Sequence, residues 1–198
     1  MAQITANEFK AAMGRIAAIM TENEEYLTEL DRQNGDGDLG ISMAAGFNEV
    51  SDMLKENTQT DLGKLFFSSA KKFNETAPSS LGTILSIGMM KAAKELKNKE
   101  EVSIQTMAQA LSAGIKNIEE KAGSKQGEKT ILDSLIPAVA AMETGNLDAA
   151  VQAAKQGSDS TREMIAVHGR AAYYGEKSIG ILDGGSVVGY LIFKAIAN

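Results

Sequence analysis

The sequence predicts an all-α fold, in which eight helices form an antiparallel up-and-down bundle or barrel with its functional site at one end. Three observations lead to this prediction. Apolar residues recur every three or four positions along most of the chain, which is the spacing of one helix face. Only two prolines occur in the 198 residues, and the alternating pattern of a half-buried strand is scarce. Glycine-rich stretches separate the helical segments, as is typical of turns.

The first helix is expected over residues 4–30. Thr5 followed by Glu8 matches a capping box, in which each residue satisfies a free backbone N–H group of the other at the start of a helix. The apolar positions of this segment share one face, and they are Phe9, Met13, Ile16 and Met20. The segment therefore has both a start signal and a side that faces a core.

Seven more helices follow in chain order. The next two cover 39–56 and 60–75, on either side of a short polar link. The helix at 79–98 has an apolar face of Leu81, Ile84, Leu85, Gly88, Ala92 and Leu96, and the helix at 103–121 has one of Ile104, Met107, Leu111, Ile115 and Ile118. The last three cover 130–144, 147–167 and 185–197, and a chain of this length is expected to form a single domain, 1–198.

Four connections contain more glycine than helix packing requires: Asp31–Gly40, Asn74–Ser80, Ala122–Lys129 and His168–Gly185. They join the first helix to the second, the third to the fourth, the fifth to the sixth and the seventh to the eighth. In an up-and-down bundle alternate connections fall at the same end. All four are therefore expected to meet there and to form the site.

Composition excludes several classes of protein. A net charge of −6 and a pI near 5.0 argue against a nucleic-acid partner, which requires a basic surface. The chain has no cysteine, so disulfides, thiol catalysis and cysteine-ligated zinc are excluded. Residues 1–10 lack a signal-peptide pattern, and no apolar run reaches membrane-spanning length. We therefore expect a cytoplasmic protein without a membrane partner.

The first glycine-rich connection is a candidate metal loop. Asp31, Asp36 and Asp38 lie close together with glycines between them, and carboxylate oxygens are the ligands that Mg²⁺ prefers. A plain polar turn between helices is the alternative. An EF-hand is excluded, because the position that needs a bidentate glutamate holds Phe47.

Two helix starts are candidate phosphate sites, because free N–H groups at such ends attract anions. Gly40, Ile41 and Ser42 open the second helix directly after the metal loop. Ser79 and Ser80 open the fourth, where each serine has a simple helix cap as its alternative role. In the last connection Arg170 is suited either to phosphate or to a surface carboxylate. The only histidine, His168, belongs to no recognisable catalytic triad.

Taken together, these segments resemble the L subunit of bacterial dihydroxyacetone kinase, which is the nucleotide-binding Dak2-type family. The resemblance runs in family order over nearly the whole chain. The matching stretches are Tyr26-Leu27-Thr28, Leu30-Asp31-Arg32, Gly35-Asp36-Gly37-Asp38 with Gly40, Leu81-Gly82-Thr83, Gly127-Glu128-Lys129-Thr130, Asp133, Pro137, Gly169-Arg170-Ala171, Gly175-Glu176-Lys177-Ser178-Ile179-Gly180, and Asp183 with Gly185.

The resemblance implies an eight-helix barrel with ADP or ATP at one end. It implies that Asp31, Asp36 and Asp38 hold two Mg²⁺ ions that bridge to the diphosphate, and that Arg170 acts with them in catalysis. The residues that it implies around the nucleotide are Leu39, Gly40, Ile41, Ser42, Ala77, Ser79, Ser80, Thr83, Ala122, Ile131, Arg170, Asp183, Gly184 and Gly185.

The resemblance also implies protein partners. In the family, a separate K subunit binds the sugar covalently through a histidine, and this chain is too short to contain that subunit. Free-standing L subunits resemble the phosphoenolpyruvate-dependent system, in which a phosphohistidine on an M subunit rephosphorylates the bound nucleotide. The expected function is therefore transfer of a γ-phosphoryl group to a hydroxyl of dihydroxyacetone or a similar short ketose. A homodimer is left open.

Two positions depart from the family pattern and keep other functions open. Leu39 stands where the family has a histidine, and residues 74–79 replace a glycine-rich segment. These changes are compatible with an ATP-dependent kinase subunit for another short sugar, such as a tetrulose. They are also compatible with a non-catalytic nucleotide-binding paralogue that regulates a K-like partner. A purely structural helical bundle is a third hypothesis.

Overall fold

The computed structural model describes residues 3–197, and they form an all-α fold with one very small sheet. Two 3₁₀ segments, η1 (Thr161–Glu163) and η2 (Arg170–Ser178), interrupt the connection between the last two helices. The α-helices are α1 (Ala6–Glu22), α2 (Glu24–Arg32), α3 (Leu39–Lys55), α4 (Leu62–Thr76), α5 (Ser80–Glu95), α6 (Ile104–Ala122), α7 (Leu132–Met142), α8 (Leu147–Ser160) and α9 (Gly184–Ala197). The predicted all-α antiparallel architecture is confirmed.

The predicted first helix, 4–30, is wrong as a single element. It is divided into α1 and α2 at Asn23, whose backbone has φ −108° and ψ 11°. The Asn23 side chain donates from Nδ2 to the carbonyl oxygen of Ile19 at 2.7 Å. An asparagine that bonds to its own backbone in this way competes with the helical pattern, and so α1 ends there.

The predicted helix at 147–167 is also too long. The described chain leaves the α conformation after Ser160, passes through η1 and becomes extended at Met164 (ψ 150°). The carbonyl oxygens of Thr161 and Met164 both accept from the ammonium of Lys129, at 2.8 and 3.1 Å. Those carbonyls are therefore turned away from the helical direction by a residue that is distant in the sequence.

A two-stranded sheet was not predicted. Antiparallel strands β1 (Gln3–Thr5) and β2 (Glu101–Ser103) pair Ile4 with Val102 at their centre. Strands of three residues are too short for an alternating pattern to stand out. Thr5 also forms the predicted capping box with Glu8, and this prediction is confirmed.

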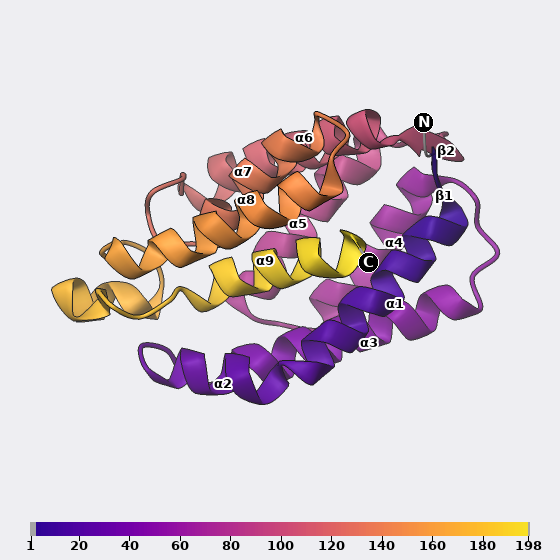
Figure 1. Cartoon of the computed structure of the whole chain (residues 1–198). Coiled ribbons are helices and arrows are strands. Elements are labelled where there is room, and N and C mark those ends of the chain that lie inside the picture. Colours follow the sequence, from indigo (N-terminus) through magenta and orange to yellow (C-terminus); the bar gives the residue numbers. More distant parts are fainter. Residues whose placement is uncertain (1–2, 198) are drawn as a thin grey trace.

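The helices form a ring that closes on itself (Figure 1). From α3 onward each helix packs against the next one in the chain, and α9 returns to lie against α1. The Arg15 guanidinium on α1 donates to the carbonyl oxygens of Ala195 and Ile196, at 2.8 and 3.4 Å. These hydrogen bonds join the first long helix of the ring to the last one.

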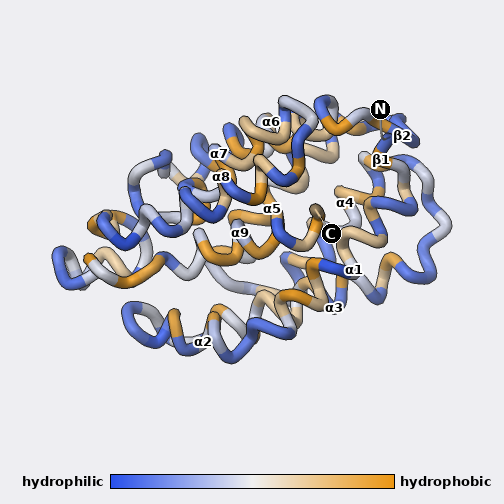
Figure 2. Tube along the Cα trace, in the orientation of Figure 1, coloured by the Kyte–Doolittle hydropathy of each residue, from blue (hydrophilic) through white to orange (hydrophobic). Residues whose placement is uncertain are grey.

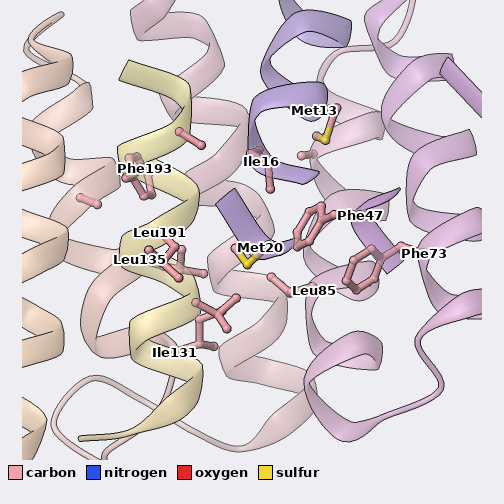
Figure 3. Packing of buried hydrophobic residues seen from close by; sticks show 14 of the residues in the cluster. Met13, Ile16, Met20, Phe47, Phe73, Leu85, Ile131, Leu135, Leu191 and Phe193 are labelled. Atoms are coloured by element: carbon pink, nitrogen blue, oxygen red, sulfur yellow. The ribbon is translucent and has the colours of Figure 1, made fainter. Parts of the chain in front are cut away.

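The ring surrounds one continuous hydrophobic cluster, to which each α-helix contributes. In Figure 3, Met20, Phe47, Leu85 and Leu191 point towards the middle of the ring from four different helices. Each helix carries both hydrophobic and hydrophilic positions, and the connections are largely hydrophilic (Figure 2). The packing leaves an apolar cavity of about 350 Å³ inside.

The glycine-rich connections after α2, α6 and α8 lie at the same end of the ring, on the left of Figure 1, and β1 and β2 mark the opposite end. The antiparallel course also brings the connection between α4 and α5 to the first end. Among residues 3–197, no helix combines the length and the apolar character that crossing a membrane requires.

Candidate functional site

The loop between α2 and α3 folds back over the carboxylate of Asp31. Asp31 Oδ2 accepts hydrogen bonds from the N–H groups of Gly37 and Asp38, at 2.7 and 3.2 Å. Gly37 has φ +77°, a conformation that glycine adopts at little cost. A Cβ atom on Gly35 would lie 2.1 Å from Asp31 Oδ1. Both glycines are thus needed for the loop to close around this side chain.

The fold brings together the three aspartates that the sequence singles out. One carboxylate oxygen from each of Asp31, Asp36 and Asp38 lies within 4.8 Å of the others. Burial raises the pKa of Asp38 above its ordinary value, and the negative charges of Asp36 and Asp31 raise it further. Three hard oxygen donors that repel one another suit a divalent cation such as Mg²⁺.

Arg170 reaches this cluster from the connection between α8 and α9. Its Nη1 atom lies 2.7 Å from Asp36 Oδ2, and both side chains are partly exposed. In this structure Arg170 therefore pairs with a surface carboxylate, which is one of the two roles expected for it. The same contact places a guanidinium beside the cluster, where it lowers the pKa of Asp38 against the effect of burial.

The start of α3, beside this cluster, has no side-chain cap. Asp38 occupies the cap position, but its side chain makes no capping hydrogen bond. The N–H group of Ser42 bonds to the Asp38 carbonyl oxygen at 2.9 Å. In the described chain the N–H groups of Leu39, Gly40 and Ile41 have no such partner. Free donors at a helix start form a favourable environment for an anion such as phosphate.

Other residues predicted around the nucleotide meet at the starts of α3, α7 and α9. A Cβ atom on Gly184 would lie 2.5 Å from Leu39 Cδ2, and one on Gly185 would lie 3.4 Å from the Ile131 nitrogen. Asp183 accepts from the Ser186 N–H at 2.6 Å and so caps α9. These contacts bring Leu39, Ile131 and residues 183–185 together.

The connection between α4 and α5 stands apart from this group. Ala77 is fully buried, and Ser79 accepts from the Gly82 N–H at 3.1 Å as the cap of α5. Ser80 and Thr83 are exposed in the first turn of α5, and Ala122 is exposed as the last residue of α6. Within residues 3–197, no hydrogen bond links these five residues to the aspartates.

Two aromatic residues that sequence reasoning missed lie at the site. Tyr173 and Tyr174, with Arg170 and Gly35, line an open cleft of about 440 Å³. Tyr173 is 92% exposed, and Tyr174 is 43% exposed. Their place beside Arg170 in the sequence was the available signal. It was weak, because tyrosines in a loop are common without a ligand.

The connection between α6 and α7 was expected at the site, but its most deeply placed residue was missed. Lys129 is 3% exposed, and its ammonium group faces the backbone of the connection between α8 and α9. The preceding residue, Glu128, lies 2.7 Å from His168 Nε2, and this contact lowers the pKa of the Glu128 carboxyl. A lysine in a glycine-rich loop normally indicates exposure, so nothing local revealed its burial.

The chain is similar to known proteins over most of its length. Residues 33–198 match the DAK2 domain. The chain is 33% identical over 176 residues to "PEP-dependent dihydroxyacetone kinase 1, ADP-binding subunit DhaL" of Listeria innocua, covering 88% of this chain and 87% of that protein. It is 27% identical over 192 residues to the corresponding ADP-binding subunit DhaL of Escherichia coli, covering 92% and 91%.

A solved structure is also similar. It is the dihydroxyacetone kinase of Citrobacter freundii in complex with AMP-PNP and Mg²⁺, with a TM-score of 0.79 and 26% sequence identity. The match covers 95% of this chain and 33% of that one. The chain thus spans about a third of the length of the solved kinase.

Proposed function

The chain belongs to the DAK2 domain family, and on this premise we propose that it is the nucleotide-binding subunit of a dihydroxyacetone kinase. In this proposal it binds ADP or ATP with Mg²⁺. The γ-phosphoryl group passes to a hydroxyl of a short ketose that is held on a separate K subunit. The observation that carries the proposal is the convergence of three carboxylates beside the uncapped start of α3.

The metal site of the proposal consists of Asp31, Asp36 and Asp38. Their mutual repulsion, expressed in the raised pKa of Asp38, is relieved when a cation lies between them. The donor set fits one or two Mg²⁺ ions, and we propose two. Bound Mg²⁺ would offset the charge of the phosphate oxygens during phosphoryl transfer.

The phosphates lie between two donor groups in this proposal. The N–H groups of Leu39, Gly40 and Ile41 lie at the start of α3, and Arg170 supplies a guanidinium from the connection between α8 and α9. Positioned donors of this kind stabilise charge that develops during transfer. The remaining nucleotide contacts are assigned to Ser42, Ala77, Ser79, Ser80, Thr83, Ala122, Ile131, Asp183, Gly184 and Gly185.

The partner of the proposal docks at the same end. Five of the exposed large apolar residues lie on one short segment beside the cleft, and they are Ile165, Val167, Tyr173, Tyr174 and Ile179. An exposed group of this composition is typical of a protein contact. A K subunit bound there would bring its sugar to the nucleotide, and an M subunit would rephosphorylate the ADP. We also propose that residues 1–198 form a single domain and that the protein is cytoplasmic. A homodimer stays a separate prediction.

Calorimetric titration with ADP tests the nucleotide site. We expect the unaltered chain to bind ADP in Mg²⁺ buffer but not in EDTA. Asp36→Ala should weaken binding at least about a hundredfold, or about 2.7 kcal/mol, because a ligand of the cation is lost. The matched control is Asp52→Ala, which removes an exposed carboxylate of α3 that pairs with Lys55 at 2.6 Å. If Asp36→Ala binds ADP as tightly as the unaltered chain does, the metal assignment is overturned. If the unaltered chain binds neither ADP nor ATP, the kinase assignment is overturned.

A second candidate is a nucleotide-binding paralogue without transfer activity. Leu39 favours it, because this side chain is 8% exposed, packs against Gly184 and offers no polar atom to the phosphates. Transfer of phosphate from labelled ATP to dihydroxyacetone in the presence of a K subunit separates the two. Binding without transfer would support the paralogue and exclude the kinase subunit.

A further inference from the structure

Lys129 is a buried cation with an unusual set of partners. Its three N–H groups face four backbone carbonyl oxygens, and Nζ lies 2.8, 3.1, 2.6 and 2.8 Å from those of Thr161, Met164, Ser178 and Ile181. Within the described residues it forms no ion pair with a carboxylate. Its own backbone has φ +60°, a strained conformation for a residue with a side chain.

The four carbonyls belong to one segment, residues 161–181, that has little regular structure. It consists of two 3₁₀ stretches and extended links, and Gly169, Gly175 and Gly180 all have positive φ. Such a segment cannot pair its own carbonyl groups as an α-helix does. Buried carbonyls without a donor are costly, and the three N–H groups of one ammonium are shared among four of them here.

The charge of Lys129 is held by dipoles rather than by a counter-ion. Burial lowers the pKa of this lysine, and the nearby Asp183 carboxylate opposes that shift. Carbonyl oxygens that surround an ammonium group favour its charged form. Backbone carbonyl oxygens surround bound monovalent cations in the same way. Here the cation is the ammonium group of a side chain.

The segment that Lys129 organises carries the residues on the far side of the candidate site. Arg170, which contacts Asp36, and the cleft residues Tyr173 and Tyr174 all lie between the second and third of the four carbonyls. The backbone of Gly180 is held in addition by Arg162, whose carbonyl oxygen accepts from the Gly180 N–H at 2.7 Å. A displacement of the segment would therefore displace the guanidinium from the aspartates.

We propose that Lys129 is a positioning residue, a tethered internal cation that gives residues 161–181 their shape and thereby places Arg170 at the site. The effect on the shape of the segment stands on geometry alone. Only the consequence for nucleotide binding rests on the proposed function.

Hydrogen exchange in the absence of nucleotide tests the first part. Lys129→Ala leaves room for n-propylammonium, which replaces the missing atoms of the side chain. We expect amide exchange in residues 162–181 to accelerate on the order of tenfold or more in Lys129→Ala, and to return towards the original rate with n-propylammonium. Tetramethylammonium has the same charge but no N–H group and should not restore it. The control variant is Lys125→Ala, since Lys125 is an exposed lysine of the same connection.

The alternative outcomes are distinct. Unchanged exchange in residues 162–181 of a folded Lys129→Ala chain would overturn the inference, and so would equal rescue by both ammonium ions. If Lys129→Ala fails to fold, its refolding yield is measured with each ion. Recovery with n-propylammonium alone supports the inference, and no recovery, or equal recovery with both, contradicts it. Lys129→Met keeps all but the last atom of the side-chain length, lacks the charge and should show the accelerated exchange.

Titration with MgADP tests the second part separately. We expect affinity to fall on the order of tenfold in Lys129→Ala and to recover with n-propylammonium, while Lys125→Ala stays unchanged. If the unaltered chain binds no ADP but the exchange results hold, the proposed function fails and the role of Lys129 in the segment stands. If ADP binds equally to all variants while exchange differs, the link from the segment to the site is overturned.

Discussion

Asp183 shows how a single side chain is placed under opposing influences. It caps α9 through the Ser186 N–H, and the charges of Asp31 and Lys129 both act on it. Burial raises its pKa from 3.8 to about 7, and the Asp133 and Asp31 carboxylates add to the shift. The Ser186 N–H and the Lys129 ammonium act in the opposite direction. The folded chain therefore holds a proton on Asp183 more strongly than the unfolded chain does.

The sign of the resulting pH dependence follows from linkage. The stabilisation from this proton is complete below pH 3.8 and is lost as the pH rises through about 7. Asparagine at this position keeps an oxygen that accepts from the Ser186 N–H but does not ionise. In urea unfolding without Mg²⁺ or nucleotide, we expect the unaltered chain to lose more stability between about pH 5 and 8 than Asp183→Asn does. Parallel pH profiles for the two chains would contradict this assignment.

At the scale of the helices, close packing depends on particular glycines. Pro137 lies inside α7 and has no N–H group to offer the carbonyl oxygen of Asp133, one turn earlier. Gly157 on α8 faces that oxygen, and a Cβ atom on Gly157 would lie only 1.9 Å from it. The absent side chain lets α8 approach α7 where the proline leaves the backbone uncovered.

Two glycine substitutions should therefore have opposite effects. Gly157→Ala forces a Cβ atom into the backbone of α7 and should destabilise the fold by about 2–3 kcal/mol. The control is Gly14→Ala on α1, where the added atom would meet only Ser51 Oγ at an ordinary 3.8 Å. Better helix propensity should make this variant more stable by up to about 1 kcal/mol. Urea midpoints of both variants test the prediction, and a Gly157→Ala chain as stable as the original would contradict the packing described here.

At the scale of the whole molecule, the ring is closed by contacts between distant parts of the chain. Arg15 on α1 binds the last carbonyls of α9, at Ala195 and Ile196. A cation at a helix C-terminus is also favoured by the helix dipole. The Arg15 guanidinium thus completes the hydrogen bonding at the end of α9 and joins α9 to α1.

Removal of this contact should weaken the whole ring. We expect Arg15→Ala to lower the free energy of unfolding by about 1–2 kcal/mol, since two hydrogen bonds from a charged group are lost. Lys55→Ala serves as the control. It removes an ion pair whose side chains are 70% and 66% exposed, and such pairs contribute less than about 1 kcal/mol. Differential scanning calorimetry measures both, and equal effects of the two substitutions would show that the contact does not support closure.

Features that depend on neighbouring residues were predictable from the sequence. Helical period, the Thr5 capping box and the aspartate loop are local patterns, since a helix face and a turn need only a few adjacent residues. The antiparallel course followed from short connections, and it was sufficient to predict that the glycine-rich loops share one end. Within the site, the approach of the three aspartates was predictable because they lie seven positions or fewer apart in one loop.

Features that join distant segments depend on the three-dimensional packing and could not be predicted from the sequence. The contact of Arg170 with Asp36, the end of α8 near Lys129 and the pairing of β1 with β2 each involve residues that are far apart in the chain. Lys129 is the clearest case. Its sequence neighbourhood is that of an exposed loop, but packing encloses its ammonium among four carbonyls of another segment. Burial and charge balance depend on what surrounds a group in space, and no local pattern contains that information.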